Sequence, residues 1–520
     1  MLATSRSGER SRRWLQERLW GSRERTNSQA SLRRELSNLR PLVNIGDPPL
    51  LIVNHEAVAL DLKQVVVDIR DPDQVVQLRG EFLEGIDIAW EESFEDWLRE
   101  ERQAIAAARE AAETGALPVG PRDDQTSSSG RPTIGIVVHQ QELPAQQMER
   151  IDDIAGKLAE RITRLRWLPL IGASAGPVQI QAGDTLVRAG RRLGVEYLLH
   201  CRSSFGRSIV IALSEARSGR MLWSNREELG DAVSPVEIDR ILTDVVAAVS
   251  MQVATDQEER VRDRSIHDLN ADELLWRARW HMRRLTVADL QIADNLLDMA
   301  AQARPGSAEI LIEKAYAEAW KLWADGEPLT SIETLRSQVM LARDTDPYDA
   351  RAWLLLGILD TWLGRHDSAA ALMQEAITLN PSLSSAYAHL GSCYSLSGCP
   401  EDGLAMVRTA LRLNPLDAQN FHQFGELALA TLMLGHHDRS VIEADNALAR
   451  RPGYVYGHVF KISALWMMGE HARAREASAA LLQVRPNFDP ATLEWLPFKD
   501  RSWNRRLRDT LTDALQFQRA

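Results

Sequence analysis

Apolar residues recur at helical spacing near the start of the chain and then alternate. Two amphipathic helices are expected, over 9–20 and over 28–40, with Ser28 as the N-cap of the second. Residues 50–62 alternate and turn at Asn54 and His55, which predicts a hairpin. The apolar positions expected to form the core of the helices are Trp14, Leu15, Leu19, Leu32, Leu36 and Leu39.

Strand-like and helical runs alternate in the middle of the chain. Strands are expected at 133–138 and 167–173 and in the runs YLLHCRSSF, SIVIALSEAR and MLWSNREEL; helices are expected near 149–165, 184–195 and 235–253. Residues 114–132 are rich in Gly, Pro, Ser and Asp, as linkers are. The pattern predicts an α/β domain over 133–255, after a linker at 114–132.

The C-terminal half is periodic. Prolines at 347, 381, 415, 452 and 486 are spaced 34, 34, 37 and 34 residues apart. A glycine follows three of them by ten residues, at Gly357, Gly391 and Gly425, and the last unit has Ile462 in that place. A second set, Gly364, Gly398, Gly435 and Gly469, marks the turn between two helices.

This period resembles the 34-residue tetratricopeptide repeat, whose aromatic positions are held here by Trp353, Tyr387 and Phe421. Four clear units run from about 348 to 486, and the 37-residue unit is expected to carry its insertion near ALATLML. Two degenerate helix pairs are expected at 271–305 and 306–347, with a cap at 487–520. We therefore expect an all-α solenoid over 265–520, with a groove for a peptide or another domain.

Charge is unevenly distributed. The whole chain has a net charge of -12, whereas residues 1–40 hold ten Arg against four Glu. A basic head on an acidic body favours a local anionic contact; the alternative is a solvated, disordered basic leader. No run approaches the length of a membrane span and no secretory signal follows Met1, so a cytoplasmic location is expected. Cys393 and Cys399 are expected in or near the repeat core.

The polar face of the second helix suits a DNA major groove, since arginines reach guanine edges or phosphates. The segments 14–20 and 29–40 resemble the OmpR-type winged helix of regulators related to the Streptomyces antibiotic regulatory proteins. The resemblance implies a recognition helix at 28–40 and a wing tip at 54–55, within a partial winged helix-turn-helix over 1–62. The expected DNA-binding residues are Asn27, Gln29, Arg33, Arg34, Ser37, Arg40, Asn54 and His55.

Residues 63–113 resemble a shortened form of the bacterial transcriptional activator domain that follows this winged helix. The matching stretches are 80–85 and 94–102. The winged-helix family opens with a small sheet and a further helix, for which this chain has about ten residues. Either the start codon lies upstream, which MLAT favours as the tail of that helix, or the domain takes its core from elsewhere.

The middle domain resembles the TolB-like α/β domain of bacterial regulators, on Leu193–Val195, the strands around Gly206, and Leu222-Trp223 after Ser218-Gly219. No phosphate loop, catalytic constellation or metal pattern is recognisable, so no enzyme activity or cofactor is expected. The chain is expected to be a multidomain transcriptional regulator. It would bind promoter DNA and, through its repeats, a protein partner such as RNA polymerase. The alternative is a repeat adaptor or scaffold that does not bind DNA.

Overall fold

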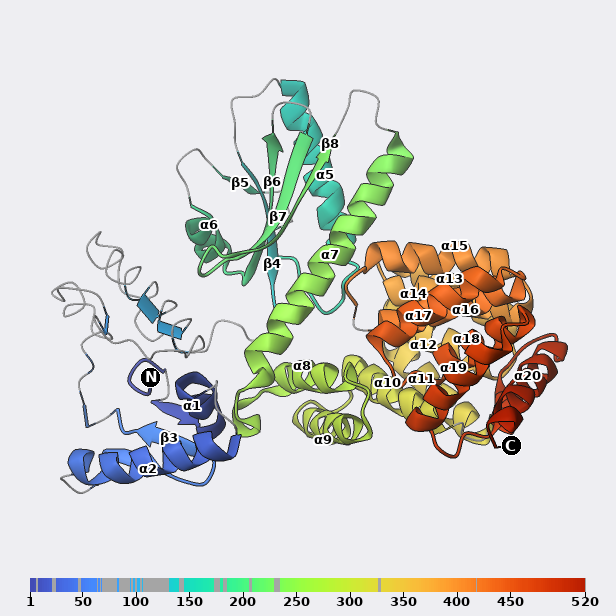
Figure 1. The fold of residues 1–520 in the computed structure, drawn as a ribbon. Helices are drawn as coiled ribbons and strands as arrows, with labels where there is room; N and C mark the ends of the chain where they lie inside the picture. Colours follow the sequence, from blue (N-terminus) through green and yellow to red (C-terminus); the bar gives the residue numbers. More distant parts are fainter. Residues whose placement is uncertain are drawn as a thin grey trace. The chain divides into compact units, whose positions relative to one another are not determined.

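The computed structural model divides the chain into two compact units, Met1–Thr126 and Ser127–Ala520 (Figure 1). The structure describes residues 1–62 except 6–7, 21–24 and 45–47, then scattered positions up to 105. It describes 131–519 except 140–144, 173–177, 181–184, 205–207, 229–233, 326–328 and 418. Residues 114–130 of the linker predicted at 114–132 and most of 63–113 lie outside the described residues. We call the two parts the N-terminal unit and the C-terminal unit.

The N-terminal unit is built from two helices and a three-stranded sheet. Its elements follow the order β1 (Glu9–Ser11), α1 (Arg12–Leu19), α2 (Arg25–Val43), β2 (Leu51–Val53) and β3 (Ala57–Leu60). The sheet is antiparallel in the order β1-β3-β2. The predicted hairpin is therefore present. The first predicted helix began too early, since 9–11 pair with β3 as a strand and Ser11 caps α1 by accepting from the Trp14 amide.

The predicted second helix began too late. Because α2 starts at Arg25, Ser28 is an interior residue and is buried, so it is not the N-cap. Leu32 and Leu36 are buried as expected, but Leu39 is 45% exposed. The small core is formed by Leu15, Leu32, Leu36, Leu51 and Val58, with Val43 at the end of α2 packed against it, and Leu39 is not part of this cluster.

Part of the core of the N-terminal unit comes from the segment after the hairpin. Phe94, Trp97 and Leu98 are buried and pack with Trp14 and Leu19 of α1. The Trp97 indole donates to Glu101 Oε1 (3.0 Å), which also accepts from the Thr4 hydroxyl (2.8 Å). The apolar side of α1 is thus covered by residues some eighty positions later in the chain.

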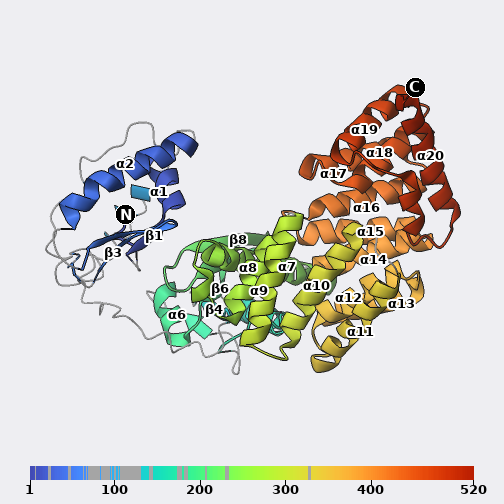
Figure 2. The ribbon, with the colours of Figure 1, turned by 90° about the horizontal axis from the view of Figure 1, so that it is seen from below.

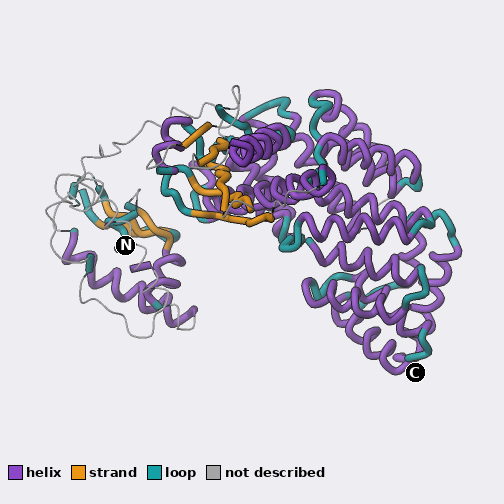
Figure 3. Tube along the Cα trace, turned by 90° about the horizontal axis from the view of Figure 1, so that it is seen from above, coloured by secondary structure: helices purple, strands orange, loops and turns teal. Residues whose placement is uncertain are grey.

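The C-terminal unit begins with an α/β sheet whose strands follow the order β5-β4-β6-β7-β8. Figure 3 shows the strands in orange and the helices in purple. Its strands are β4 (Ile134–His139), β5 (Val178–Ile180), β6 (Tyr197–Ser204), β7 (Ser208–Glu215) and β8 (Met221–Glu228). β4 is parallel to both of its neighbours, and β6, β7 and β8 form an antiparallel meander. The prediction of a strand over 167–173 is wrong. This run makes one isolated bridge, from Leu170 to Ile134, and the edge strand is β5.

Helices cover both faces of this sheet. The alternating pattern of β4, β6 and β7 puts Ile136, Leu199 and Ile211 on the face covered by α5 (Ala145–Ile162) and α7 (Pro235–Arg262). The other face, with Val137 and Leu198, packs with α6 (Leu186–Leu193). The helix expected near 235–253 is longer than predicted, because α7 continues to Arg262. It extends beyond the sheet towards α8 (Figure 1). The TolB-like resemblance stays a prediction.

The rest of the unit is a solenoid of paired helices (Figure 2). Helix α7 leads into six pairs, which confirms the prediction of helical repeats. The pairs are α8 (Ala271–Met282) with α9 (Val287–Ala303), α10 (Ala308–Asp325) with α11 (Leu329–Thr345), α12 (Ala350–Trp362) with α13 (His366–Leu379), α14 (Ser384–Ser397) with α15 (Pro400–Leu413), α16 (Asn420–Met433) with α17 (His437–Arg450), and α18 (Val455–Met467) with α19 (His471–Val484).

The residues after the last pair cap the stack, as expected. A short 3-10 helix, η3 (Pro490–Trp495), leads to α20 (Ser502–Arg519). The α20 side chains Leu507 and Leu511 are buried in the same apolar cluster as Phe460 of α18. Without such a cap, the apolar face of the last pair would be exposed to water.

The 37-residue unit is arranged differently from the prediction. Gly357 and Gly391 each face a residue twelve positions later, Ala369 and Gly403, in the second helix of their pair. The same separation joins Ala428 to Ser440, whose hydroxyl donates to the Ala428 carbonyl oxygen (2.8 Å).

Ala428, not Gly425, therefore occupies the close-approach position, and Phe424 replaces Phe421 at the aromatic position. The insertion lies before Ala428, at the start of α16, and not in the later part of the ALATLML run. A Cβ on Gly425 would instead meet the ring of Tyr454.

Candidate functional site

The residues predicted to contact DNA are all exposed. Gln29, Arg33, Ser37 and Arg40 follow one face of α2, and Asn27 and Arg34 lie beside that face. At the hairpin tip, Asn54 Oδ1 accepts from the amides of Glu56 and Ala57, so this side chain shapes the turn. His55 is exposed beside it.

The hairpin is tied to the end of α2. The Asn44 side chain donates to the Leu51 carbonyl oxygen (2.9 Å) and accepts from the Leu51 amide (2.6 Å). Arg12 Nη1 donates to the Asn54 carbonyl oxygen (3.1 Å), which joins the turn to the start of α1. These contacts hold the basic helix face and the turn in a defined relation within the N-terminal unit.

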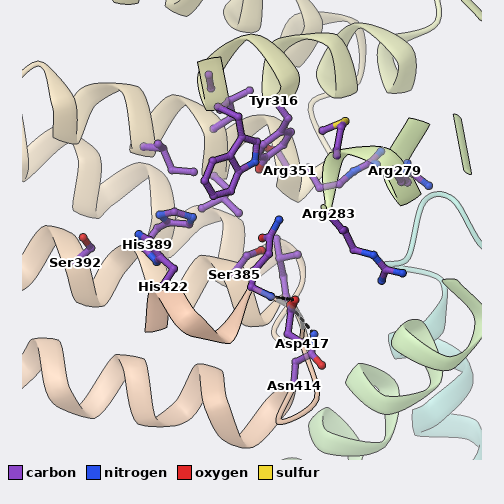
Figure 4. Close-up of a pocket in the computed structure, with 18 of the residues that line it drawn as sticks. Arg279, Arg283, Tyr316, Arg351, Ser385, His389, Ser392, Asn414, Asp417 and His422 are labelled. Atoms are coloured by element: carbon purple, nitrogen blue, oxygen red, sulfur yellow. Dashed lines mark hydrogen bonds between the residues drawn. The ribbon is translucent and has the colours of Figure 1, made fainter. Parts of the chain in front are cut away.

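A larger feature is found on the inner face of the solenoid. A cavity of about 810 Å³ is lined by the first helix of each of the six pairs (Figure 4). Residues 250–258 of α7 form one wall, and Trp495, Leu496 and Pro497 before α20 line it as well. The site therefore combines the α/β domain's last helix, the repeats and the cap. Its aromatic lining includes Trp280, Tyr316, Trp320, Trp362, Tyr456 and Trp495.

Two arginines of the lining belong to a buried ion-pair cluster. Arg279 Nε and Arg351 Nη1 both donate to Glu313 Oε1, at 2.8 and 2.9 Å. Arg279 also donates to Glu309 (3.0 Å), and Arg351 to Asp349 (2.6 Å). Burial opposes ionisation of Glu309 and Asp349, but the neighbouring arginines outweigh it, so the pKa of each carboxyl lies below its usual range. Both arginines therefore already have carboxylate partners.

The α7 wall is attached to the repeats by polar contacts. Arg283, at the end of α8, forms an ion pair with Glu258, and Arg412 of α15 forms one with Asp244. The Ser382 hydroxyl donates to the Thr243 carbonyl oxygen (3.0 Å). Just after α5, Trp167 packs edge-on against Trp276 of α8, with 5.2 Å between ring centroids. The α/β domain thus closes one side of the inner face.

Deep on the inner face of α14 and α16 lies a polar group of His389, His422 and Glu426. The two imidazole rings are 5.3 Å apart, and His422 Nε2 is 3.5 Å from Glu426 Oε1. Burial lowers the pKa of His389 to about 3, and His422 adds to this effect. Burial also raises the pKa of Glu426, against the opposing effects of His422 and a hydrogen bond with Ser392. Both buried groups are therefore biased towards their neutral forms.

The sequence prediction did not single out any of these cavity residues. The sequence does contain a pattern that could have indicated them. Ser385, His389 and Ser392 are spaced i, i+4, i+7 and form a polar stripe along α14. The structure shows that this stripe faces the cavity (Figure 4). Cys393 is buried as predicted, whereas Cys399 is exposed because it precedes the first turn of α15.

Within the described ranges, no group of three or more His, Cys, Asp or Glu side chains could hold a metal ion. None of the helices in the described part of the chain combines the length and apolar character needed to cross a membrane.

Comparison with known proteins gives structural similarity alone. No protein-family model matches the sequence, and no curated protein matches it. Among solved structures, the APC/C hetero-tetramer Cut9-Hcn1 matches 50% of this chain with 14% identity and a TM-score of 0.38. The match spans 48% of the solved chain, about half its length.

Two shorter tetratricopeptide-repeat proteins are matched over nearly their whole length. TTC0263 of Thermus thermophilus is 19% identical, covers 38% of this chain and is itself 99% covered, with a TM-score of 0.31. YrrB, described as having an unusual peptide-binding site, is 18% identical, covers 35% and is 98% covered, with a TM-score of 0.26.

Proposed function

We propose that this protein is a repeat-based interaction adaptor that holds a segment of a partner protein on the inner face of its solenoid. The cavity of about 810 Å³ lined by all six first helices carries this proposal. A concave, mostly apolar site with a few placed polar groups is the usual form of a recognition site. The proposal assigns the protein no reaction and no cofactor.

The contacts on the inner face support binding in preference to catalysis. Arg279 and Arg351 are held by carboxylates, and His389 is held neutral by burial, so neither kind of group is prepared for proton transfer. The α7 wall makes the site continuous with the α/β domain. A bound segment would therefore contact the last helix of the α/β domain and the repeats at once.

A random peptide library displayed on phage, selected against the full chain, tests this proposal. Peptides should be enriched on the wild type and should bind at least tenfold more weakly to Ser392→Trp, whose indole would fill the cavity. Ala405→Trp is the matched control, because Ala405 is exposed on the outer helix α15. Absence of enrichment, or peptides that both variants bind equally, would contradict an inner-face site.

A second function is favoured by a separate observation. We propose that the N-terminal unit binds DNA, because the eight predicted contact residues are exposed and α2 presents Gln29, Arg33, Ser37 and Arg40 along one face. The order of strand, two helices and hairpin supports this proposal, as does the concentration of arginine in residues 1–40. Binding of promoter DNA and recruitment of RNA polymerase would follow from both proposals together.

Selection from a random-sequence DNA library with the full chain, followed by gel-shift titration across salt concentrations, tests the second function. Replacing Arg33 and Arg34 by Ala should weaken binding and reduce the salt slope by about two, because two fewer arginines then neutralise phosphates. The control replaces Arg188 and Arg408, two exposed arginines of the C-terminal unit. Equal binding by both double variants would refute the assignment.

A further inference from the structure

The inner-face cavity also indicates the chemistry of its occupant, if the proposed adaptor function holds. The arginines named in its lining have carboxylate partners within the fold. Arg279 and Arg351 are paired with Glu313, and Arg283 is paired with Glu258 of α7. An anionic group entering this space would lose its hydration and would have to compete with these carboxylates for a cation, which is costly. The occupant that suits the cavity is therefore not an anion.

The remaining surface favours an aromatic group. Trp280, Trp320 and Trp362 line the cavity from three successive first helices, and Tyr456 and Trp495 line it from the last pair and the cap. Trp495 Nε1 already donates to the Tyr456 hydroxyl (3.0 Å), so this pair is fixed in place. Rings gain both buried area and edge-to-face contacts among other rings, and single aromatic anchors dominate many binding surfaces.

Among the described residues that line the cavity, two buried acceptor atoms have no hydrogen-bond partner, Asn414 Oδ1 and Glu426 Oε2, and of these two residues Glu426 is the more deeply buried. Glu426 is 7% exposed, and its Oε2 accepts no hydrogen bond from any group in the described part of the chain. The side chain lines the cavity beside His422. A buried acceptor without a donor costs free energy that an entering donor would recover.

We propose that the partner segment anchors in the cavity by one aromatic side chain that bears a hydrogen-bond donor, tryptophan or tyrosine, and that this donor reaches Glu426 Oε2. The indole N–H fits this role because indole donates and does not accept. The ring lies among the aromatic residues between α7 and the first helices. The anchor therefore contacts both the α/β domain's last helix and the repeats.

The experiment uses the full chain and two neutral probes, N-acetyl-tryptophanamide and its 1-methylindole analogue, which lacks the donor. Saturation-transfer NMR titration should show binding of the first and at least fivefold weaker binding of the second, the usual worth of one buried hydrogen bond. Glu426→Leu should abolish this preference, and Glu426→Gln, which retains an acceptor oxygen, should preserve it. Glu401→Leu, an exposed change on α15, is the control.

The outcomes separate the anchor from the adaptor function. Equal affinity for the two probes, a preference that survives Glu426→Leu, or no binding of either probe would each overturn the anchor. Phage-selected peptides that depend on the inner face but contain no Trp or Tyr would also overturn it, while leaving the adaptor function intact. Failure to select any inner-face peptide, by contrast, contradicts the adaptor function itself.

Discussion

Replacing Gly391 by alanine should destabilise the repeat pair α14–α15, although alanine is the better helix former. A Cβ at Gly391 would lie 2.6 Å from Val407 Cγ2 and 2.8 Å from the Gly403 carbonyl oxygen. The carbonyl belongs to the backbone of α15 and cannot turn aside as a side chain could. The two helices approach this closely only because both Gly391 and Gly403 lack a side chain.

The size of the effect follows from two opposing contributions. Alanine in place of a mid-helix glycine gains about 0.5–1 kcal/mol of helix stability. Separating two packed helices to admit a methyl group costs about 1–3 kcal/mol. We therefore expect a net loss of about 1–2 kcal/mol in the free energy of opening α14 and α15.

The matched control is Gly156→Ala in α5. Gly156 is also a mid-helix glycine, but a Cβ there would meet nothing within 4 Å. This variant should gain about 0.5–1 kcal/mol from helix propensity alone. The pair of variants thus separates the effect of packing from the effect of helix propensity.

Hydrogen–deuterium exchange with mass spectrometry is the appropriate assay, because a chain of several domains does not unfold as one unit. Peptides from α14 and α15 should exchange faster in Gly391→Ala, whereas peptides from α5 should exchange more slowly in Gly156→Ala. If α14–α15 were as protected in Gly391→Ala as in the wild type, the close approach would not be an essential feature of the repeat.

Three further predictions concern the site and its supports. The pKa of His389 is lowered from its ordinary value of 6.5, so below pH 6.5 the unfolded chain binds a proton at this residue and the folded chain does not. The free energy of unfolding should therefore fall as the pH drops from 6.5 towards 4. His389→Gln should flatten that dependence in thermal melts at pH 7 and pH 5, and an unchanged profile would contradict a buried neutral imidazole. Trp97→Ala should destabilise the N-terminal unit by about 3 kcal/mol or more because it leaves Trp14 and Leu19 partly uncovered; limited proteolysis should then cleave residues 1–62 faster than in an Arg188→Ala control. Asp244→Arg should loosen α7 from the repeats because it places a second positive charge beside Arg412, and the double variant with Arg412→Asp should restore the contact. Hydrogen–deuterium exchange at α7 should be faster in the single variant alone. Equal exchange in the single and double variants would show that the ion pair does not hold the helix.

Local patterns in the sequence were sufficient to predict the repeat architecture. The proline period, the turn glycines Gly364 and Gly398, and the apolar stripes each depend on residues within one helix or one turn, so they can be read without the fold. Both turn glycines adopt the positive φ that favours glycine, 73° and 100°. The three strands of the meander and the hairpin at residues 50–62 were predictable for the same reason.

Features that depend on residues far apart in the chain were set by tertiary packing. The 37-residue unit contains a glycine at the expected spacing, yet the partner twelve positions later places Ala428 at the helix contact. The run at 167–173 is as apolar as a strand, but β5 takes the neighbouring edge of β4. The cover of α1 comes from Phe94, Trp97 and Leu98, which no local pattern connects with Trp14.

The candidate site belongs to the second group. The sequence alone indicated that paired helices would stack, and it contains the polar stripe that runs along α14. It took the folded chain to bring Glu426, Trp320 and α7 to one cavity, because that requires the first helices of six pairs to align and a helix from another domain to cover them. Periodicity is encoded by neighbours along the chain, whereas a binding site is formed by neighbours in space.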